Sequence, residues 1–207
     1  MRDNARDVKL HFGLLITFLA LLVWSVIKPH DLFTWILETA PAMIALVILI
    51  TTYRRFRLSN LAYVLIWIHA IILLVGGHYT YAEVPLFNWI RDAYNLSRNH
   101  YDRVGHFAQG FVPAIIAREV LLRKSPLEPG KLLAFIVISV CLAISAAYEL
   151  IEFGVSMATG SAGDAFLGTQ GDVWDTQRDM LMCLIGAVTA LVTLSGMHNR
   201  SLQRLPD

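Results

Sequence analysis

Six uninterrupted apolar segments constrain this chain more than any other feature of its sequence. They are Leu10–Ile27, Leu32–Ile50, Leu61–Gly76, Val104–Leu122, Leu132–Met157 and Met180–Gly196. Each is close to the roughly 17–25 residues that a helix needs to cross a bilayer with some tilt. Only 16% of the residues are charged, against roughly 25% in an average soluble domain. We therefore predict an integral membrane protein.

The architecture that these segments predict is an all-α, polytopic bundle of six transmembrane helices. A closed β-barrel also satisfies every backbone group in lipid, but its strands alternate apolar and polar residues, whereas these runs are continuous. No linker, internal repeat or low-complexity tract divides the sequence, so residues 1–207 are expected to form one membrane-embedded domain. The first segment follows basic residues, as in a signal peptide, but Trp24–His30 lacks a small-residue cleavage site, and we retain it as a span.

The distribution of basic residues predicts the orientation of the bundle. With six spans, one face carries Arg2, Arg6, Lys9, Arg54, Arg55, Arg57, Arg118, Arg123, Lys124, Lys131, Arg200 and Arg204. The other face carries Lys28, Arg91, Arg98, Arg103 and Arg178. Because basic loops stay in the cytoplasm, both termini are predicted to be cytoplasmic. The net charge of +1 suggests no nucleic-acid partner, and the expected partner is the lipid bilayer.

Polar residues gather where the fourth and fifth segments meet the outward face. Asp102 and His106 are four residues apart, so a helix places them on one stripe, where they can share a metal ion or work as an acid–base pair. The simpler alternative is that Asp102 caps the helix. Glu149 and Glu152 lie in an apolar run, and a carboxylate at such a position is usually functional. The alternatives for the two glutamates are an ion pair with a neighbour such as Arg103 or Arg178, or a protonated, hydrogen-bonded carboxyl group.

Three aspartates open the last segment. Asp172, Asp175 and Asp179 are spaced i, i+3 and i+7, which aligns them on one helical face where like charges repel unless a cation or proton relieves them. Asp172 is the most suitable helix cap of the three. Glycines in the preceding loop allow it to fold back over the site; they are Gly163, Gly168 and Gly171.

The third segment ends in His78, which reaches the same face and is the last member of the predicted site. Two other ionisable residues are interpreted structurally: His69 as a core residue, and Glu38, near Pro41, as a packing or kink feature. The two cysteines, at 141 and 183, lie in mid-span and are expected to pack as small apolar groups.

Together these residues predict one outward-facing His/carboxylate site. The catalytic candidates are Asp102, His106, Glu149 and Asp175. The candidate metal ligands are His78, His106, Glu149, Glu152, Asp172, Asp175 and Asp179. The dominance of carboxylates makes Mg²⁺ or Mn²⁺ as plausible a cofactor as Zn²⁺.

At these residues the chain resembles the YjdF-like family of bacterial inner-membrane proteins. The segments that carry the resemblance are His78–Tyr81, Asn99–His106, Tyr148–Glu152 and Gly171–Asp179. The resemblance implies a multi-pass inner-membrane protein and carries no activity with it. A weaker resemblance, to VanZ-like membrane proteins, lies in the order of a segment with Arg103 and His106, then Glu149, then Asp175, and implies an outward-facing polar site.

Three functions fit the sequence. The first is a metal-dependent enzyme that acts on a lipid head group or a lipid-linked substrate at the outer leaflet. The second is a cation- or proton-linked transporter or binding protein, although few polar residues continue toward the cytoplasmic side. The third is a structural protein whose polar cluster holds the helices together. Neither the substrate nor an oligomeric state is specified by the sequence.

Overall fold

The computed structural model describes residues 2–160, 166 and 168–205, and over these residues every regular element is helical. The helices are α1 (Arg2–Val26), α2 (Leu32–Thr52), α3 (Asn60–Tyr79), the 3₁₀ turn η1 (Tyr81–Glu83), α4 (Pro85–Tyr94), α5 (Tyr101–Lys124), α6 (Lys131–Thr159) and α8 (Asp175–Leu202). The predicted all-α class is confirmed. Five of the helices are long and apolar enough to span a membrane, namely α1, α2, α3, α6 and α8. The remaining long helix, α5, is less apolar because it contains residues such as His106, Arg118 and Glu119.

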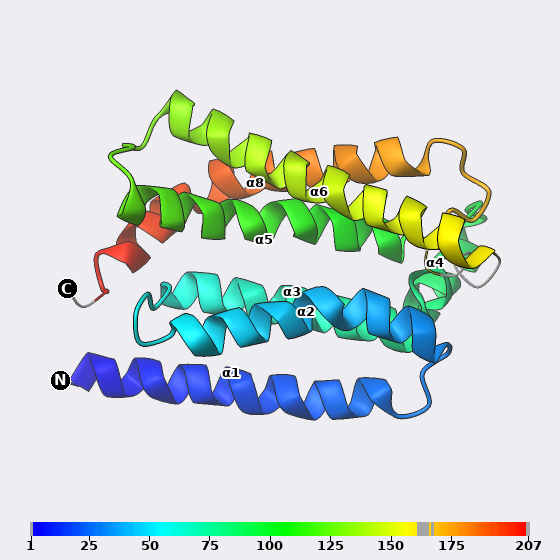
Figure 1. Cartoon of the computed structure of the whole chain (residues 1–207), viewed down its shortest axis with the longest axis horizontal. Helices are drawn as coiled ribbons and strands as arrows, with labels where there is room; N and C mark the ends of the chain where they lie inside the picture. The colour runs from blue at the N-terminus through cyan, green and yellow to red at the C-terminus, as the bar shows by residue number, and fades with distance from the viewer. Residues whose placement is uncertain (1, 161–165, 167, 206–207) are drawn as a thin grey trace.

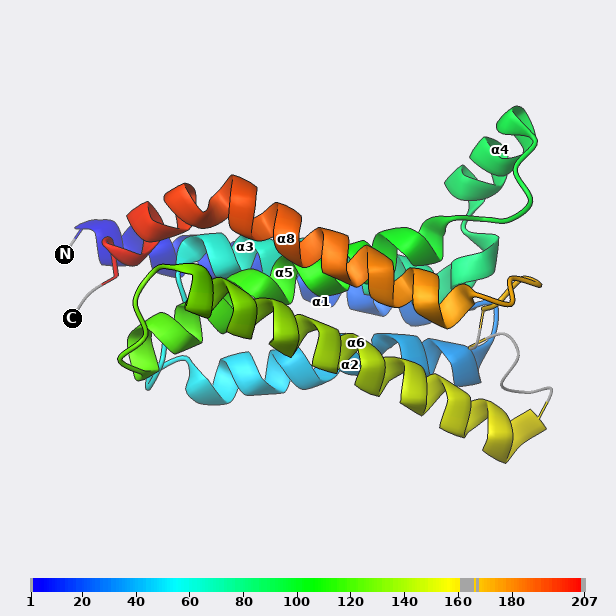
Figure 2. The ribbon, with the colours of Figure 1, turned by 90° about the horizontal axis from the view of Figure 1, so that it is seen from above.

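The long helices form two groups of three (Figure 1). Helices α1, α2 and α3 make one group, and α5, α6 and α8 make the other. Contact between α3 and α5 joins the groups. Both termini lie at one end of the bundle, here called the terminal end, and the short helix α4 projects from the opposite end, here called the site end (Figures 1 and 2).

Local sequence signals set where the helices of the first group begin. The carboxylate of Asp31 accepts a hydrogen bond from the backbone N–H of Thr34 at 2.6 Å, and this bond holds the pKa of Asp31 below its usual range. The hydroxyl of Ser59 accepts from the N–H of Ala62 at 3.3 Å and caps α3 in the same way. Both caps satisfy backbone donors that the first turn of a helix leaves free.

Two glycines allow α5 and α8 to approach each other closely. A Cβ atom on Gly110 of α5 would lie 1.8 Å from the carbonyl oxygen of Cys183, and one on Gly186 of α8 would lie 2.1 Å from that of Phe107. Helix pairs in membranes gain van der Waals contact when small residues line their interface. Cys183 and Cys141 are free and fully buried in this core, as predicted for small apolar groups.

At the terminal end, a buried polar network ties α5 to α3 and α8. The carboxylate of Glu119 accepts hydrogen bonds from the hydroxyl of Ser59 at 2.6 Å and from Arg123 at 2.7 Å, and it lies 3.1 Å from His198. His198 in turn meets Arg118 at 2.8 Å. This network satisfies polar groups that the bundle would otherwise bury without partners.

The α5–α8 contact leads to a first prediction. Replacing Gly186 by Ala forces the two backbones apart, and we expect a loss of roughly 1–3 kcal/mol in the free energy of unfolding. Gly196 is the matched control, because it lies on the same helix and a Cβ atom added there would meet nothing within 4 Å. Gly196→Ala should be neutral or stabilising by up to about 1 kcal/mol. Equal effects of the two substitutions on unfolding in detergent would contradict this account of the interface.

Candidate functional site

The site end gathers most of the residues that the sequence singles out. Asp102 and His106 come from the start of α5, Glu149 and Glu152 from the second half of α6, and Asp175 and Asp179 from the first two turns of α8. One further residue of this group, Asp172, lies in the turn before α8. Contacts among their side chains, described below, connect three helices that are far apart in the sequence.

Arg103 of α5 occupies the centre of the aspartate group. Its guanidinium donates to Asp172 at 3.1 Å and to Asp175 at 2.6 Å, and it also forms an ion pair with Asp179. Only Asp175 and Asp179 lie on α8, whereas Asp172 lies in the turn before it, yet all three carboxylates meet one common partner. The partner is an arginine of the neighbouring helix, so this part of the cluster holds α5 against α8.

Arg98, in the loop before α5, extends the network to the loop before α8. Its guanidinium forms ion pairs with Asp175 and, at 3.3 Å, with Asp102. It also donates to the backbone carbonyls of Thr169 at 3.3 Å and Gly168 at 3.4 Å. These bonds fix the loop before α8 close to the start of α5.

The described residues of the loop before α8 lie beside the start of α5. Gly168 and Gly171 have φ angles of +60° and +83°, which glycine adopts without strain; Gly163 lies outside the described residues. Asn99 and Gln170 exchange two hydrogen bonds, of 2.9 and 3.0 Å. The ring of Phe166 is buried and lies 6.2 Å from that of Tyr148 on α6.

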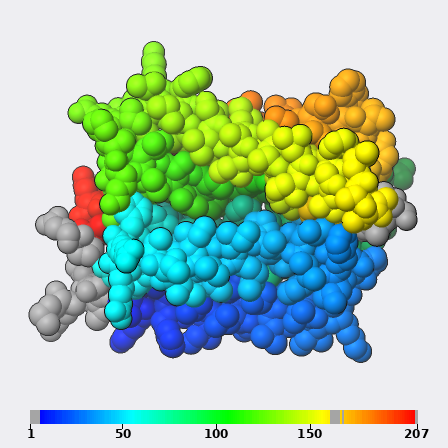
Figure 3. All heavy atoms as spheres, viewed as in Figure 1, coloured from blue at the N-terminus to red at the C-terminus, as the bar shows by residue number. Residues whose placement is uncertain are grey.

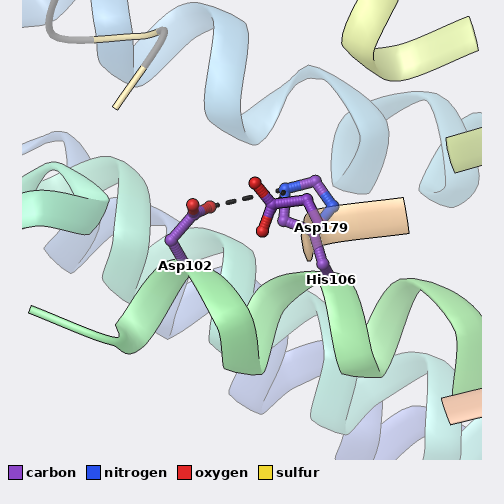
Figure 4. Close-up of side chains that lie close together, drawn as sticks. All are labelled: Asp102, His106 and Asp179. Atoms are coloured by element: carbon purple, nitrogen blue, oxygen red, sulfur yellow. Dashed lines mark ion pairs between the residues drawn. The ribbon is translucent and has the colours of Figure 1, made fainter. Parts of the chain in front are cut away.

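Asp102, His106 and Asp179 form the most compact group of possible metal ligands among the described residues (Figure 4). One ligand atom from each lies within 4.8 Å of the other two. Nε2 of His106 is 3.4 Å from Oδ1 of Asp102 and 3.8 Å from Oδ1 of Asp179. Two ligands that are each about 2.1 Å from a tetrahedral ion lie about 3.4 Å apart, so these spacings suit one ion.

The other ring nitrogen of His106 determines what Nε2 offers to this group. Nδ1 lies 3.2 Å from Oε1 of Gln109, and in the tautomer that carries its hydrogen on Nδ1 the ring donates to this oxygen. In the neutral ring Nε2 then presents a lone pair toward two carboxylates. That arrangement is repulsive unless a proton or a metal cation lies between them.

The glutamates of α6 extend this acidic region. Oε1 of Glu149 lies 3.8 Å from Nδ1 of His106 and has no hydrogen-bond partner among the described residues, although it is buried. Neither Glu149 nor Glu152 forms an ion pair with an arginine in the described part of the chain. Arg103 and Arg178, the partners considered for them from the sequence, bind aspartates instead.

A cavity of about 850 Å³ begins at this region and runs between the two helix groups. At the site end it is lined by polar side chains, which are Glu38, Tyr81, Asp102, His106, Tyr148 and Glu152. Farther along, its walls are mainly apolar residues of α1, α2, α3 and α5. The site therefore opens into the interior of the bundle.

His78 has neighbours other than the acidic cluster. Its Nδ1 lies 3.1 Å from the carbonyl oxygen of Ser25, and its ring packs 4.4 Å from the ring of Trp24 and 4.5 Å from that of Tyr79. The structure thus brings together six of the seven predicted metal ligands within one connected region and leaves His78 against α1.

Two titratable groups at the aqueous edge of the site, His100 and Asp172, have shifted pKa values. Burial, with the positive charges of Arg98 and Arg103, lowers the pKa of His100. Desolvation opposes ionisation of Asp172, but the backbone N–H of Trp174 and the guanidinium of Arg178 outweigh it and lower the pKa of Asp172. Asp172 is therefore a carboxylate at neutral pH. The prediction that it caps α8 is wrong, because Trp174 is the N-cap residue and no side chain among the described residues caps this helix; Asp172 accepts from the N–H of Trp174 in the preceding turn.

Four residues of the site were not recognised from the sequence: Glu38, Tyr81, Arg98 and Tyr148. Glu38 is 2% exposed and accepts a hydrogen bond at 3.3 Å from the hydroxyl of Tyr148, which bridges α2 and α6. The ring of Tyr81 fills the space beside Gly76 and Gly105. Arg98 was assigned only to a face. Glu38 could have been recognised, because a carboxylate within the outer half of a membrane span is usually functional.

The arginine–aspartate network leads to a second prediction. Arg103 has a side-chain exposure of 11%, whereas Arg178, which binds the same Asp172, is 57% exposed. We expect Arg103→Met to lower the free energy of unfolding by roughly 3–5 kcal/mol, because it leaves the buried Asp179 without an arginine partner among the described residues. Arg178→Met should cost less than about 1 kcal/mol. Unfolding in detergent measures both, and a similar small loss in the two variants would show that Arg103 does not hold the cluster.

Comparison with known proteins agrees with the sequence resemblance. A family model described as "Predicted membrane protein (DUF2238)" matches residues 10–200. The inner membrane protein YjdF of Escherichia coli (strain K12) is 49% identical over 189 residues, which cover 91% of this chain and 90% of that protein. No solved structure matches the chain.

Proposed function

This chain belongs to the DUF2238 family of predicted membrane proteins, and we propose that it is an inner-membrane enzyme that acts on a lipid or lipid-linked head group. In this proposal, a divalent cation lies among Asp102, His106 and Asp179. The observation that carries it is the convergence of these three side chains, with ligand atoms within 4.8 Å of one another, at the polar end of an apolar cavity. A polar substrate with an apolar anchor fits such a combination.

The ligand set limits the choice of ion. Two carboxylates and one imidazole suit Mn²⁺ or Zn²⁺ better than Mg²⁺, which prefers oxygen ligands alone. Arg103 binds the same oxygen of Asp179 that faces His106, so it orients this ligand and also reduces the negative charge available to the ion. Asp175 is bound by Arg98 and Arg103, and we assign it a positioning role.

Glu149 is the best-placed candidate for a general base. Its Oε1 is buried, unpartnered among the described residues and 3.8 Å from His106. A carboxylate in this position can take a proton from a water bound to the cation, while the cation polarises a phosphoryl or acyl oxygen of the substrate. Glu152 and Glu38 contribute further acidic groups to the same cavity.

The position of α5 supports six crossings with both termini in the cytoplasm. Five helices meet the criteria for a span by length and composition, yet the chain ends lie together at the terminal end (Figure 1). An even number of crossings returns the chain to its starting side, and α5 is the long helix that supplies the sixth. The excess of basic residues in the loops of the terminal end favours the cytoplasm for that side.

Topology is a third prediction. Fusions of a fluorescent protein to the N-terminus and, separately, to the C-terminus should both fluoresce, because both partners fold in the cytoplasm. Alkaline phosphatase inserted after Asn95, at the end of α4, should be active in the periplasm. An active phosphatase at either terminus would contradict the proposed orientation.

Metal binding is a fourth prediction. Elemental analysis of the detergent-purified protein, loaded with Mn²⁺ or Zn²⁺ and dialysed, should find one ion per chain. His106→Asn should abolish binding, whereas Gln109→Ala should weaken it by roughly 10–100-fold, because Gln109 only orients the histidine. His78→Ala is the matched control on the same side of the membrane and should retain the ion.

The alternatives give different results in the same measurements. No metal in the unchanged protein, or full retention in the His106→Asn variant of equal helicity, would overturn the metal-dependent proposal. A protonated His106 between Asp102 and Asp179 would then be the remaining explanation of the cluster, and would favour a proton-linked or structural role.

Cation- or proton-linked transport has one supporting observation. The cavity continues from Asp102 as far as His11 and Tyr53, toward the terminal end. Between these ends, however, its walls are largely apolar, with residues such as Phe18, Ala42 and Leu46. An ion pathway needs polar groups along its length, so we rank transport below head-group chemistry.

A further inference from the structure

The apolar part of the cavity is a groove with an opening toward the membrane. Six apolar residues line the cavity and are also exposed on the outside of the bundle: Val8 at 48% and Phe12 at 62% on α1, Ile48 at 53% and Ile50 at 60% on α2, Val120 at 39% on α5, and Ile144 at 42% on α6. In the space-filling view the surface is hollowed along the boundary between α2 and α6 (Figure 3). The groove therefore opens sideways, between the two helix groups.

The surroundings of this opening determine what can enter it. Helices α2 and α6 are membrane-spanning by length and composition, so their exposed apolar residues face the hydrocarbon of the bilayer. Water is absent there, and an apolar cavity does not hold ordered water. A void of about 850 Å³ is also not left empty, because the energetic cost of a cavity rises with its volume. Lipid chains are the material that is present at this depth.

The groove has the length and the polarity gradient of a site for one lipid chain. Glu38 and Thr52, both on α2 and both lining it, are separated by about 21 Å along the helix axis. One leaflet of hydrocarbon is about 15 Å deep, half of a core of about 30 Å. The groove is therefore longer than one leaflet is deep, so it can hold a hydrocarbon chain along the whole depth of its leaflet. The acidic side chains that line the cavity, Glu38, Asp102 and Glu152, all lie at the site end, whereas the polar lining of the other end consists of residues such as His11 and Tyr53.

We propose that the groove binds one hydrocarbon chain of a membrane lipid, which enters between α2 and α6 and places its polar head beside Glu38, Tyr148 and His106. The hydrogen bond of 3.3 Å from Tyr148 to Glu38 crosses the seam at the site end, so the chain passes below it while the head group meets the polar residues. The chemistry at the head group rests on the function proposed above. Binding of the chain does not, because it depends only on the shape and polarity of the groove.

The test uses the full chain in phospholipid vesicles of phosphatidylethanolamine and phosphatidylglycerol, with a trace of phosphatidylethanolamine that carries a diazirine in one acyl chain. Irradiation and peptide mass spectrometry then locate the labelled residues. In the unchanged protein we expect labels on groove residues such as Ile116, besides those on outer surfaces such as Leu150. Ala45→Phe places a ring in the groove and should reduce the label at Ile116 by roughly tenfold, since the two occupants overlap.

Ile44→Phe is the matched control, because Ile44 is the preceding residue of α2, is 59% exposed and does not line the cavity. It should leave the groove label unchanged. A second variant, Ile116→Trp, blocks the groove from the α5 wall, and the label is then read on α3. It replaces Ala45→Phe if the Ala45→Phe variant loses its helicity.

The outcomes separate this proposal from the metal site. Asp179→Asn should lose Mn²⁺ yet keep the groove label, and Ala45→Phe should keep Mn²⁺ yet lose the label. Labels confined to outer surfaces in the unchanged protein, or a groove label equal in Ala45→Phe, Ile116→Trp and the control, would overturn chain binding whatever the metal results are.

Discussion

The structure depends on how the charged side chains of helix α5 are paired inside an apolar bundle. An isolated carboxylate or guanidinium in a low-dielectric interior is costly, so buried charges occur in pairs or networks. Arg103 of α5 binds three aspartates at the start of α8, and Gly110 and Gly186 let the two backbones approach so closely that these side chains can meet. Glu119 and His198 repeat the arrangement at the terminal end of the same helix pair. The α5–α8 pair is thus fixed by polar contacts at both ends and by glycine packing between them.

The neutralisation is unequal across the cluster, and this inequality separates structure from chemistry. Asp175 is bound by two arginines, so its charge is compensated. Glu149 has no arginine partner among the described residues, and the lone pair of His106 faces two carboxylates. Acidic groups that remain uncompensated at such depth need a proton or a metal cation. Two members of this part of the cluster, Asp102 and His106, also line the cavity, which is why we assign binding and chemistry to it.

The sequence predicted the helices well, because lipid leaves the backbone few alternatives to a helix and the apolar runs record this directly. Spacing along a single helix also predicted which residues share a face: Asp102 with His106, and Asp175 with Asp179, whereas Asp172 lies before the helix begins. Contacts between helices could not be read in this way. The bridge from Tyr148 to Glu38 depends on how closely α2 and α6 approach, and the neighbours of His78 depend on the position of α1. Hydropathy alone underestimates how well α5 suits a membrane span, because its polar residues are paired within the bundle rather than exposed to lipid.

The position of the cavity bears on which kind of substrate the site can receive. At the site end, residues 168–170 of the loop before α8 are bound to the start of α5 by Arg98 and by the paired bonds of Asn99 with Gln170. From the membrane side, the groove between α2 and α6 reaches the same cluster. In the function proposed here, a lipid enters along this groove and its head group lies at the polar end. Access from the bilayer would account together for the apolar walls and the acidic end of the cavity.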